Sequence, residues 1–268
     1  MSKRKSLGFL PDARRAVLMT AVIASTAFLA SSVSAQVDES RRILKSMSDY
    51  VSSQKMISGT MDTDIEVITP NLQKIQFASS GTFALSRPDR FRATRSGGYS
   101  DVELVFDGAA ATILGRHANI YTQVKSPGSF DQLVSRLRDE FAVSISGADL
   151  LLTNPGEQLM TDVLEIAHIG HGVIDGVDCD HIAARGQEVD WQLWVEIGPR
   201  RIPRKYVITS KTVTGAPQYT LRIKSWSTEP ISADSFVFKP PPAAKLVEPR
   251  AMPEIDEVPA AVVKGDKK

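Results

Sequence analysis

Hydrophobic and polar residues alternate over most of the chain after residue 59, and this period of two predicts β-strands. One segment shows it best, because five apolar residues share one face: Val189, Trp191, Leu193, Val195 and Ile197. Asp107-Gly108 and Asp175-Gly176 separate neighbouring segments and are typical of tight hairpin turns. The predicted strands span residues 60–69, 73–85, 90–96, 101–106, 111–115, 119–125, 165–174, 177–186, 189–197, 203–213 and 217–227.

Other segments have a helical period. Residues 38–57 carry apolar side chains at steps of three and four, and Gly59 is expected to end this helix. Residues 128–140 repeat the pattern, with Ser129 as the N-cap. Residues 147–164 predict one or two short helices that Asn154-Pro155 interrupts. The order is therefore a helix, a run of strands, a helical insertion and a second run of strands.

Consecutive strands joined by tight turns favour an antiparallel sheet, and a large sheet with one apolar face tends to curl around covering helices. We therefore predict an α+β fold. It is a curved antiparallel sheet, a half-open barrel of about 10–11 strands, wrapped around the N-terminal helix and the central helical insertion. The expected organisation is one domain over residues 36–244. Residues 245–268 are rich in Pro, Ala, Lys and Glu, and we expect a disordered tail there.

The first residues predict an export signal. A basic start is followed by an uncharged, mostly apolar run from Ala16 to Ala30, and Val33-Ser34-Ala35 fits the small-residue rule of signal peptidase. We predict a signal peptide over residues 1–35, cleaved before Gln36, and hence a periplasmic protein with no stable membrane span after cleavage. The alternative is an uncleaved anchor, but the apolar run is shorter than the roughly 20 residues that cross a membrane.

Composition excludes several classes of protein. The 268 residues have a formal net charge of +1, without the basic surplus of a dedicated nucleic-acid binder, so no nucleic-acid partner is expected. The single cysteine, Cys179, excludes an internal disulfide framework, a cysteine-rich zinc site and c-type haem attachment. The chain also lacks a P-loop, a dinucleotide-binding fingerprint and a Gly-x-Ser-x-Gly elbow. We therefore expect neither a cofactor nor catalytic residues.

The candidate ligand-binding surface is the apolar face of the sheet. Ten residues are predicted to point to its concave side and to contact a hydrophobic ligand: Phe83, Leu85, Phe91, Leu104, Phe106, Trp191, Leu193, Val195, Tyr219 and Leu221. If the helices cover this face incompletely, a cavity for an acyl chain remains. If they cover it completely, the same residues form an ordinary core.

One group of residues has metal-binding or nucleophilic chemistry. It comprises His168, His171, Cys179, Asp180 and His181. In a regular strand, residues three apart point to opposite faces, so His168 and His171 can bind one ion only if the strand contains a bulge. Cys179 and His181 share a face, but the flanking aspartates disfavour a reactive thiolate. We therefore expect no metal site and an inert, buried thiol.

Several motifs resemble those of known envelope proteins. They are Arg87-Pro88-Asp89-Arg90-Phe91-Arg92, Phe106-Asp107-Gly108, Ile174-Asp175-Gly176-Val177-Asp178-Cys179-Asp180-His181, Asp190-Trp191-Gln192-Leu193-Trp194, Ile202-Pro203-Arg204 and Phe236-Val237-Phe238-Lys239-Pro240-Pro241. Over roughly residues 40 to 245 the chain resembles the lipoprotein-carrier superfamily of the LolA/LolB type. Within it, the chain is most similar to a family of predicted periplasmic proteins known as a domain of unknown function. The resemblance implies the half-barrel fold and a hydrophobic concave surface.

These observations together predict a non-catalytic periplasmic carrier or binding protein for a lipid, a lipoprotein or another hydrophobic ligand. Envelope proteins are a second class of expected partner. One alternative is an envelope assembly factor or scaffold with a filled core. A further alternative is a hydrolase or metal-binding protein that uses the region from His168 to His181.

Overall fold

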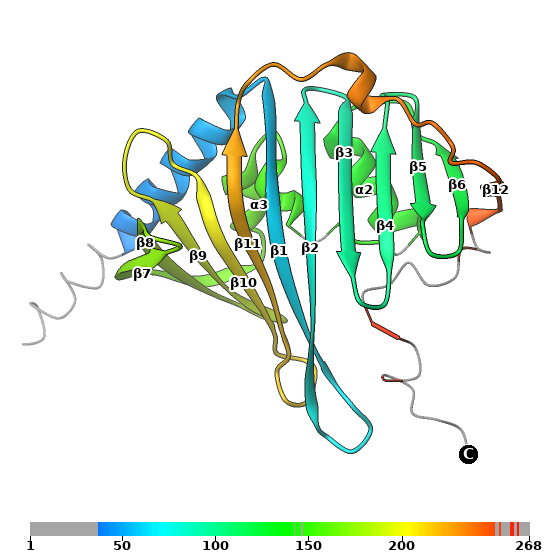
Figure 1. Ribbon diagram of the computed structural model, residues 1–268. Helices are drawn as coiled ribbons and strands as arrows, with labels where there is room; N and C mark the ends of the chain where they lie inside the picture. Colours follow the sequence, from blue (N-terminus) through cyan, green and yellow to red (C-terminus); the bar gives the residue numbers. More distant parts are fainter. Residues whose placement is uncertain are drawn as a thin grey trace, which may run out of the picture.

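The computed structural model describes residues 37–141, 143–145, 147–249, 252, 258, 259 and 262. The predicted signal peptide therefore lies outside the described residues. The described chain is helical over residues 37–53 and then forms one twelve-stranded sheet with the order β12-β6-β5-β4-β3-β2-β1-β11-β10-β9-β8-β7. The sheet curves strongly and the helices lie on its concave side (Figure 1). The predicted α+β class and the curved, open sheet around helices are confirmed.

Two meanders build the sheet. The first contains β1 (Met56–Ile68), β2 (Lys74–Ser86), β3 (Arg90–Gly97), β4 (Asp101–Phe106), β5 (Ala110–Gly115) and β6 (Ile120–Lys125). The second contains β7 (Val163–Ile174), β8 (Val177–Gly186), β9 (Val189–Glu196), β10 (Pro203–Ser210) and β11 (Gln218–Ser227). Antiparallel pairing of β1 with β11 joins the meanders, with partners such as Thr63 and Leu221. Both meanders consequently present one continuous concave face.

Alternation places the apolar side chains on that face. In β9, Trp191, Leu193 and Val195 are buried, whereas Gln192 and Trp194 between them are only partly buried. The helix at residues 37–53 buries its apolar stripe against the same face, including Ile43, Met47 and Val51. The core is therefore a single layer of side chains between the sheet and the helices.

The chain between the meanders covers the other part of the concave face. It contains α2 (Phe130–Phe141), the 3-10 helix η1 (Ala148–Leu151) and α3 (Pro155–Leu159). Ser129 caps α2, as predicted: its hydroxyl accepts from the Gln132 backbone N–H, and the Gln132 side chain accepts from the Ser129 N–H. The Phe130 and Phe91 rings lie 4.5 Å apart, so the start of α2 packs directly on β3.

Several predicted boundaries are wrong. The N-terminal helix ends at residue 53 and β1 begins at Met56, because residues 56–59 pair with the upper end of β2. Gly59 is therefore a strand residue and ends no helix. Past η2 (Ala233–Phe236), β12 (Lys245–Leu246) pairs in parallel with β6, so the segment predicted to be a disordered tail begins with a strand. With this strand, the sheet of the described residues has twelve strands, more than the predicted ten or eleven.

Candidate ligand-binding site

The concave face brings the ten predicted contact residues together. Nine of them are buried: Phe83, Leu85, Phe91, Leu104, Phe106, Trp191, Leu193, Val195 and Leu221. Tyr219 is partly buried and packs against the same cluster. Their common orientation follows from the period of two and from the β1–β11 pairing that joins the two meanders. The residues that were predicted to form one apolar surface therefore lie in one core.

The helices cover most of this surface and leave only a small cavity. The cavity between the sheet and the covering chain has a volume of about 40 Å³. Three of the ten predicted residues, Phe83, Phe91 and Leu221, line it. One water molecule needs about 10–15 Å³ of such cavity volume, so this space is far too small for an acyl chain. Among the described residues, the space between the sheet and the cover is therefore not the large cavity considered from the sequence.

A short segment closes the middle of the concave face. We call residues 143–145 and 147–152 the cover segment. Ala148, Leu150 and Leu151 of this segment are buried, and together with Ile145 and Gly147 they form one wall of the 40 Å³ cavity. Gly147 adopts a φ of 81°, and a Cβ atom there would lie 2.5 Å from Leu221 Cδ2. Glycine therefore permits both the turn and the close approach to β11.

Polar contacts between the sheet and the cover segment come from side chains. Tyr206 in β10 donates its hydroxyl to Asp149 Oδ2 at 3.0 Å. Arg87, in the turn after β2, donates to the carbonyls of Leu151 at 2.8 Å and Leu152 at 3.2 Å. No backbone–backbone hydrogen bond links the cover segment to a strand among the described residues. The segment thus rests on the sheet through apolar packing and a few side-chain hydrogen bonds.

Asp149 is an ionisable group at the inner side of the cover segment. Burial raises its pKa, although the hydrogen bond from Tyr206 and bonds from backbone N–H groups favour the carboxylate. Burial and the neighbouring carboxylate also raise the pKa of Tyr206, so its hydroxyl remains a donor. The acidic residues are scattered along the sequence, so the sequence gives no indication of this pair. Only the packing of η1 on β10 brings Asp149 and Tyr206 together.

Replacement of Asp149 by asparagine is expected to change the pH dependence of stability. The folded protein takes up a proton at Asp149 at a higher pH than the unfolded chain does, so this carboxyl lowers the stability at neutral pH. That penalty shrinks as the pH falls below the raised pKa, and it is gone once the pH lies below the ordinary aspartate pKa of the unfolded chain. Asp149→Asn keeps an oxygen acceptor for Tyr206 and stays neutral. Its stability advantage over the wild type should be largest near neutral pH and shrink in acid.

Thermal unfolding of both proteins across a pH series measures this effect. Asp178→Asn, at an exposed position of β8, is the control. A difference between Asp149→Asn and the wild type that is the same at every pH would contradict the assignment.

The residues with candidate nucleophilic chemistry do not form a catalytic group. Cys179 is fully buried, and burial raises the pKa of its thiol to about 11. His181 stacks on Trp194 with ring centroids 4.0 Å apart, and its Nε2 contacts the side-chain oxygen of Gln192 at 3.0 Å. These contacts give no support to a thiol nucleophile, and the expectation of a buried thiol is confirmed.

The two remaining histidines are placed differently from the expectation. The pairing of β7 with β8 shifts between His168 and Gly170, and this bulge puts His168 and His171 on one face with Asp180. Gly170 has a φ of 133°, which glycine adopts most readily. A glycine inside a predicted strand was the sequence signal for the bulge.

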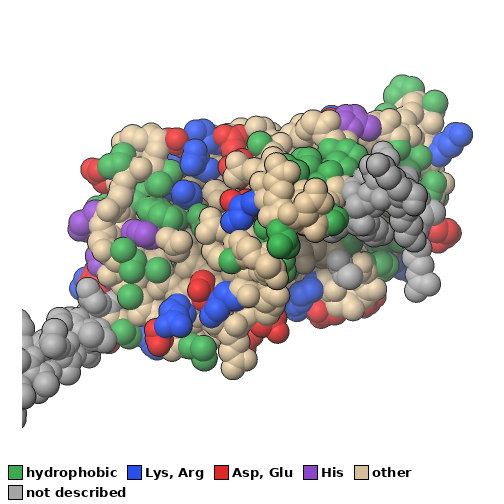
Figure 2. Space-filling model, turned by 90° about the horizontal axis from the view of Figure 1, so that it is seen from below, with side chains coloured by type: hydrophobic (Ala, Val, Ile, Leu, Met, Phe, Trp, Pro, Cys, Tyr) green, Lys and Arg blue, Asp and Glu red, His purple; other side chains and the backbone are tan. Residues whose placement is uncertain are grey.

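The surface of the molecule carries hydrophobic groups and a hollow. Figure 2 shows hydrophobic side chains reaching the lower surface in groups separated by charged ones. A hollow of about 400 Å³ lies at β2 and the β3–β4 turn, where Gln76, Ser79, Tyr99 and Ser100 contribute to its lining. It is separate from the residues that line the covered cavity. No helix among the described residues is long and apolar enough to cross a membrane.

Comparison with known proteins assigns the chain to a family and otherwise finds only distant structural similarity. None of the curated proteins matches the chain in sequence. An uncharacterized conserved protein from Thermus thermophilus is similar in structure, with 9% identity, a TM-score of 0.47, and coverage of 78% of this chain and 99% of that one. LprF from Mycobacterium bovis has 10% identity, a TM-score of 0.44, and coverage of 74% and 97%. The Mycobacterium tuberculosis lipoprotein LppX has 14% identity, a TM-score of 0.36, and coverage of 72% and 98%.

Identities and TM-scores this low carry no argument about function. The family match is of a different kind, because it extends over residues 40–248 and thus over the whole sheet and its covering segments. The chain belongs to the family described as "Predicted periplasmic protein (DUF2092)".

Proposed function

We propose that this protein is a non-catalytic periplasmic carrier or binding protein for a lipid or another hydrophobic ligand. The ligand lies on the concave face of the sheet, in the space that the cover segment fills in the closed form. The observation that carries the proposal is the way the apolar face is closed: a short segment lies on it without a backbone–backbone hydrogen bond to any described strand. The ten concave residues named above are the proposed contact surface.

Displacement of the cover segment is the proposed route to a binding site. Leu150 and Leu151 fill space above Phe91 and Leu221, so their withdrawal would enlarge the cavity that these residues line. Apolar surface sheltered from water contributes about 25 cal/mol per Å², so an acyl chain that replaces the two leucines compensates for their exposure. The polar groups released with the segment exchange their hydrogen bonds for bonds to water, which reduces the cost of breaking them.

The proposal includes export to the periplasm through residues 1–35 as a cleaved signal peptide. The basic start, the apolar run and Val33-Ser34-Ala35 support it. The description of the family as predicted periplasmic proteins supports the same compartment. Envelope proteins that deliver or receive the ligand are the second proposed class of partner.

Thiol labelling tests the movement directly. Leu150→Cys places a thiol at a position that is 1% exposed, so a maleimide should label it slowly in the protein alone and at least tenfold faster with palmitate. Leu164→Cys, at a position that is 64% exposed, is the control and should react rapidly in both conditions. The native Cys179, which is buried, reports global unfolding in the wild type and should remain slow.

A second function is favoured by the volume of the cavity. A concave face with only about 40 Å³ of free space is also what a structural scaffold or assembly factor of the envelope would have. Native mass spectrometry of protein purified from its own periplasm distinguishes the two functions. Co-bound lipid and palmitate-dependent labelling support the carrier. Protein free of lipid, with Leu150→Cys labelling that palmitate leaves unchanged, would overturn it in favour of the scaffold.

A further inference from the structure

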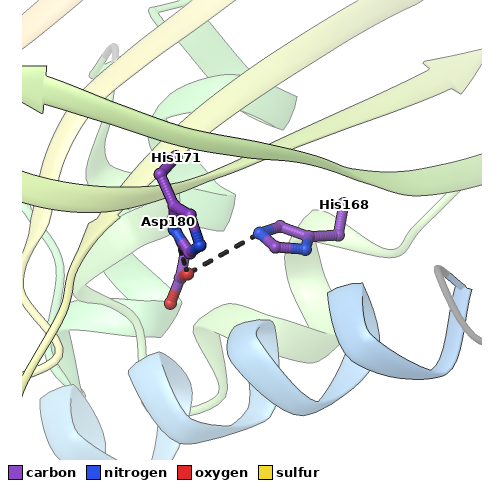
Figure 3. A group of neighbouring side chains, drawn as sticks. All are labelled: His168, His171 and Asp180. Atoms are coloured by element: carbon purple, nitrogen blue, oxygen red, sulfur yellow. Dashed lines mark ion pairs between the residues drawn. The ribbon is translucent and has the colours of Figure 1, made fainter.

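Two histidines and an aspartate converge at the free edge of the sheet. The bulge in β7 between His168 and Gly170 turns both imidazoles to the side where Asp180 of β8 lies. Both rings point toward the carboxylate of Asp180, above the N-terminal helix (Figure 3). The candidate ligand atoms of the three residues all lie within 4.8 Å of one another. Residues from two strands thus face one common point.

The distances fit a coordination shell. His168 Nε2 lies 3.6 Å from Asp180 Oδ1, and His171 Nδ1 lies 3.3 Å from the same oxygen. Zinc binds imidazole nitrogen and carboxylate oxygen at about 2.0–2.2 Å, which places neighbouring ligand atoms of a tetrahedron about 3.4 Å apart. The two rings are inclined by 72°, so they are not stacked on each other. Small side-chain rotations would bring the third pair of atoms to the same separation.

His168 Nε2 is a buried polar atom that points independently to a ligand at this place. Nε2 is buried and has no hydrogen-bond partner among the described residues, although it is aimed at Asp180. A buried polar atom without a partner is costly and is rare in folded proteins. A metal ion bound at Nε2 would satisfy it. His171 is 70% exposed in its side chain, so the same point is open to solvent and to an incoming ion.

The surrounding charges accommodate a cation. Arg201 donates to the other oxygen of Asp180, Oδ2, at 2.9 Å and so orients the carboxylate while leaving Oδ1 toward the histidines. Such an outer partner is typical of metal-binding carboxylates. On the N-terminal helix, Glu39 and Arg42 form an ion pair. The positive charges of Arg201 and Arg42 are therefore balanced by Asp180 and Glu39 before any ion binds.

We propose that His168, His171 and Asp180 bind one divalent transition-metal ion, with Zn²⁺ as the preferred ion at neutral pH. Two imidazoles and one carboxylate form a donor set that suits zinc and excludes the oxygen-preferring Ca²⁺ and Mg²⁺. Three protein ligands leave a fourth position for water. The ion ties β7, the free edge of the sheet, to β8. The site lies outside the covered cavity, so this inference is independent of the proposed carrier function.

Titration of metal-free protein without a histidine tag tests the site. Isothermal titration with Zn²⁺ should show one saturable site, and Co²⁺ bound there should give the visible absorption of a tetrahedral complex. His171→Ala removes a ligand at an exposed position and should weaken Zn²⁺ binding about 100-fold. Asp180→Asn should have a similar effect. Circular dichroism confirms that each variant is folded.

His117→Ala is the matched control. His117 lies in the turn between β5 and β6, where its ring contacts the carbonyl of Tyr99, and its replacement should leave the Zn²⁺ affinity unchanged. A wild-type protein with no saturable zinc site would overturn the proposal. Equal zinc affinities of the His171→Ala and His117→Ala variants would overturn it as well.

Discussion

Replacement of Phe91 by alanine is expected to lower the free energy of unfolding by about 4 kcal/mol. Phe91 is 2% exposed, packs its ring on Phe130 at the start of α2, and lines the cavity under the cover segment. Truncation removes the apolar contacts of the ring and leaves a void that the rigid sheet fills only in part. Urea unfolding followed by tryptophan fluorescence measures the loss.

Phe77→Ala is the matched control for this variant. Phe77 lies on β2 and, by alternation, on the same face as Phe83, but it is only partly buried. Its truncation should cost less than half as much. Equal losses from the two variants would mean that α2 adds little to the packing of Phe91, and that the concave face is not closed as the structure describes.

Replacement of Gly59 by alanine is expected to cost about 3 kcal/mol, because the site has no room for a side chain. A Cβ atom there would lie 2.2 Å from the backbone oxygen of Ser225 and 2.7 Å from the ring of Phe83. The register pairs Gly59 with Trp226 on β11 and with Phe83 on β2, and these two rings meet edge to face with centroids 6.0 Å apart. The added methyl group would force β1 and β11 apart.

Gly98→Ala tests the same substitution without the crowding. A Cβ atom at Gly98 meets no atom within 4 Å, and its φ is not positive. The change there should stay within about 0.5 kcal/mol. Thermal and urea unfolding of both variants give the comparison. A Gly59→Ala protein as stable as the Gly98→Ala protein would show that the β1–β11 junction tolerates a wider spacing.

These two positions bear on the proposed function because one lies in the junction of the sheet and the other lies under its cover. Gly59 lies at the seam that joins the two meanders, and Phe91 lies under the chain between them. A carrier must open one side of this core while the sheet persists. We therefore expect the cover segment, and neither β1 nor β3, to be the part that moves.

The elements of the sheet could be predicted because their signal is local. In β9, the alternation from Val189 to Val195 depends only on neighbours in the chain, as does the Asp175-Gly176 turn, where both residues have positive φ. The boundaries near Gly59 and Lys245 were wrong because they depend on pairing with distant strands. Met56 pairs with Ser86, and Lys245 pairs with Ile120. No local pattern contains that information.

The candidate sites, too, depend partly on local sequence patterns and partly on contacts between distant segments. The sequence by itself determined which of the ten apolar residues share a face within each strand, because side chains of a strand alternate in direction. The β1–β11 pairing then placed the faces of the two meanders side by side. Only the tertiary structure decided how far that face is filled, because the fit of Leu150 and Leu151 over Phe91 and Leu221 depends on side-chain volumes brought together from distant segments. The bulge beside Gly170 likewise decided that His168 and His171 meet Asp180, since one extra residue in a strand reverses the side to which the following side chains point.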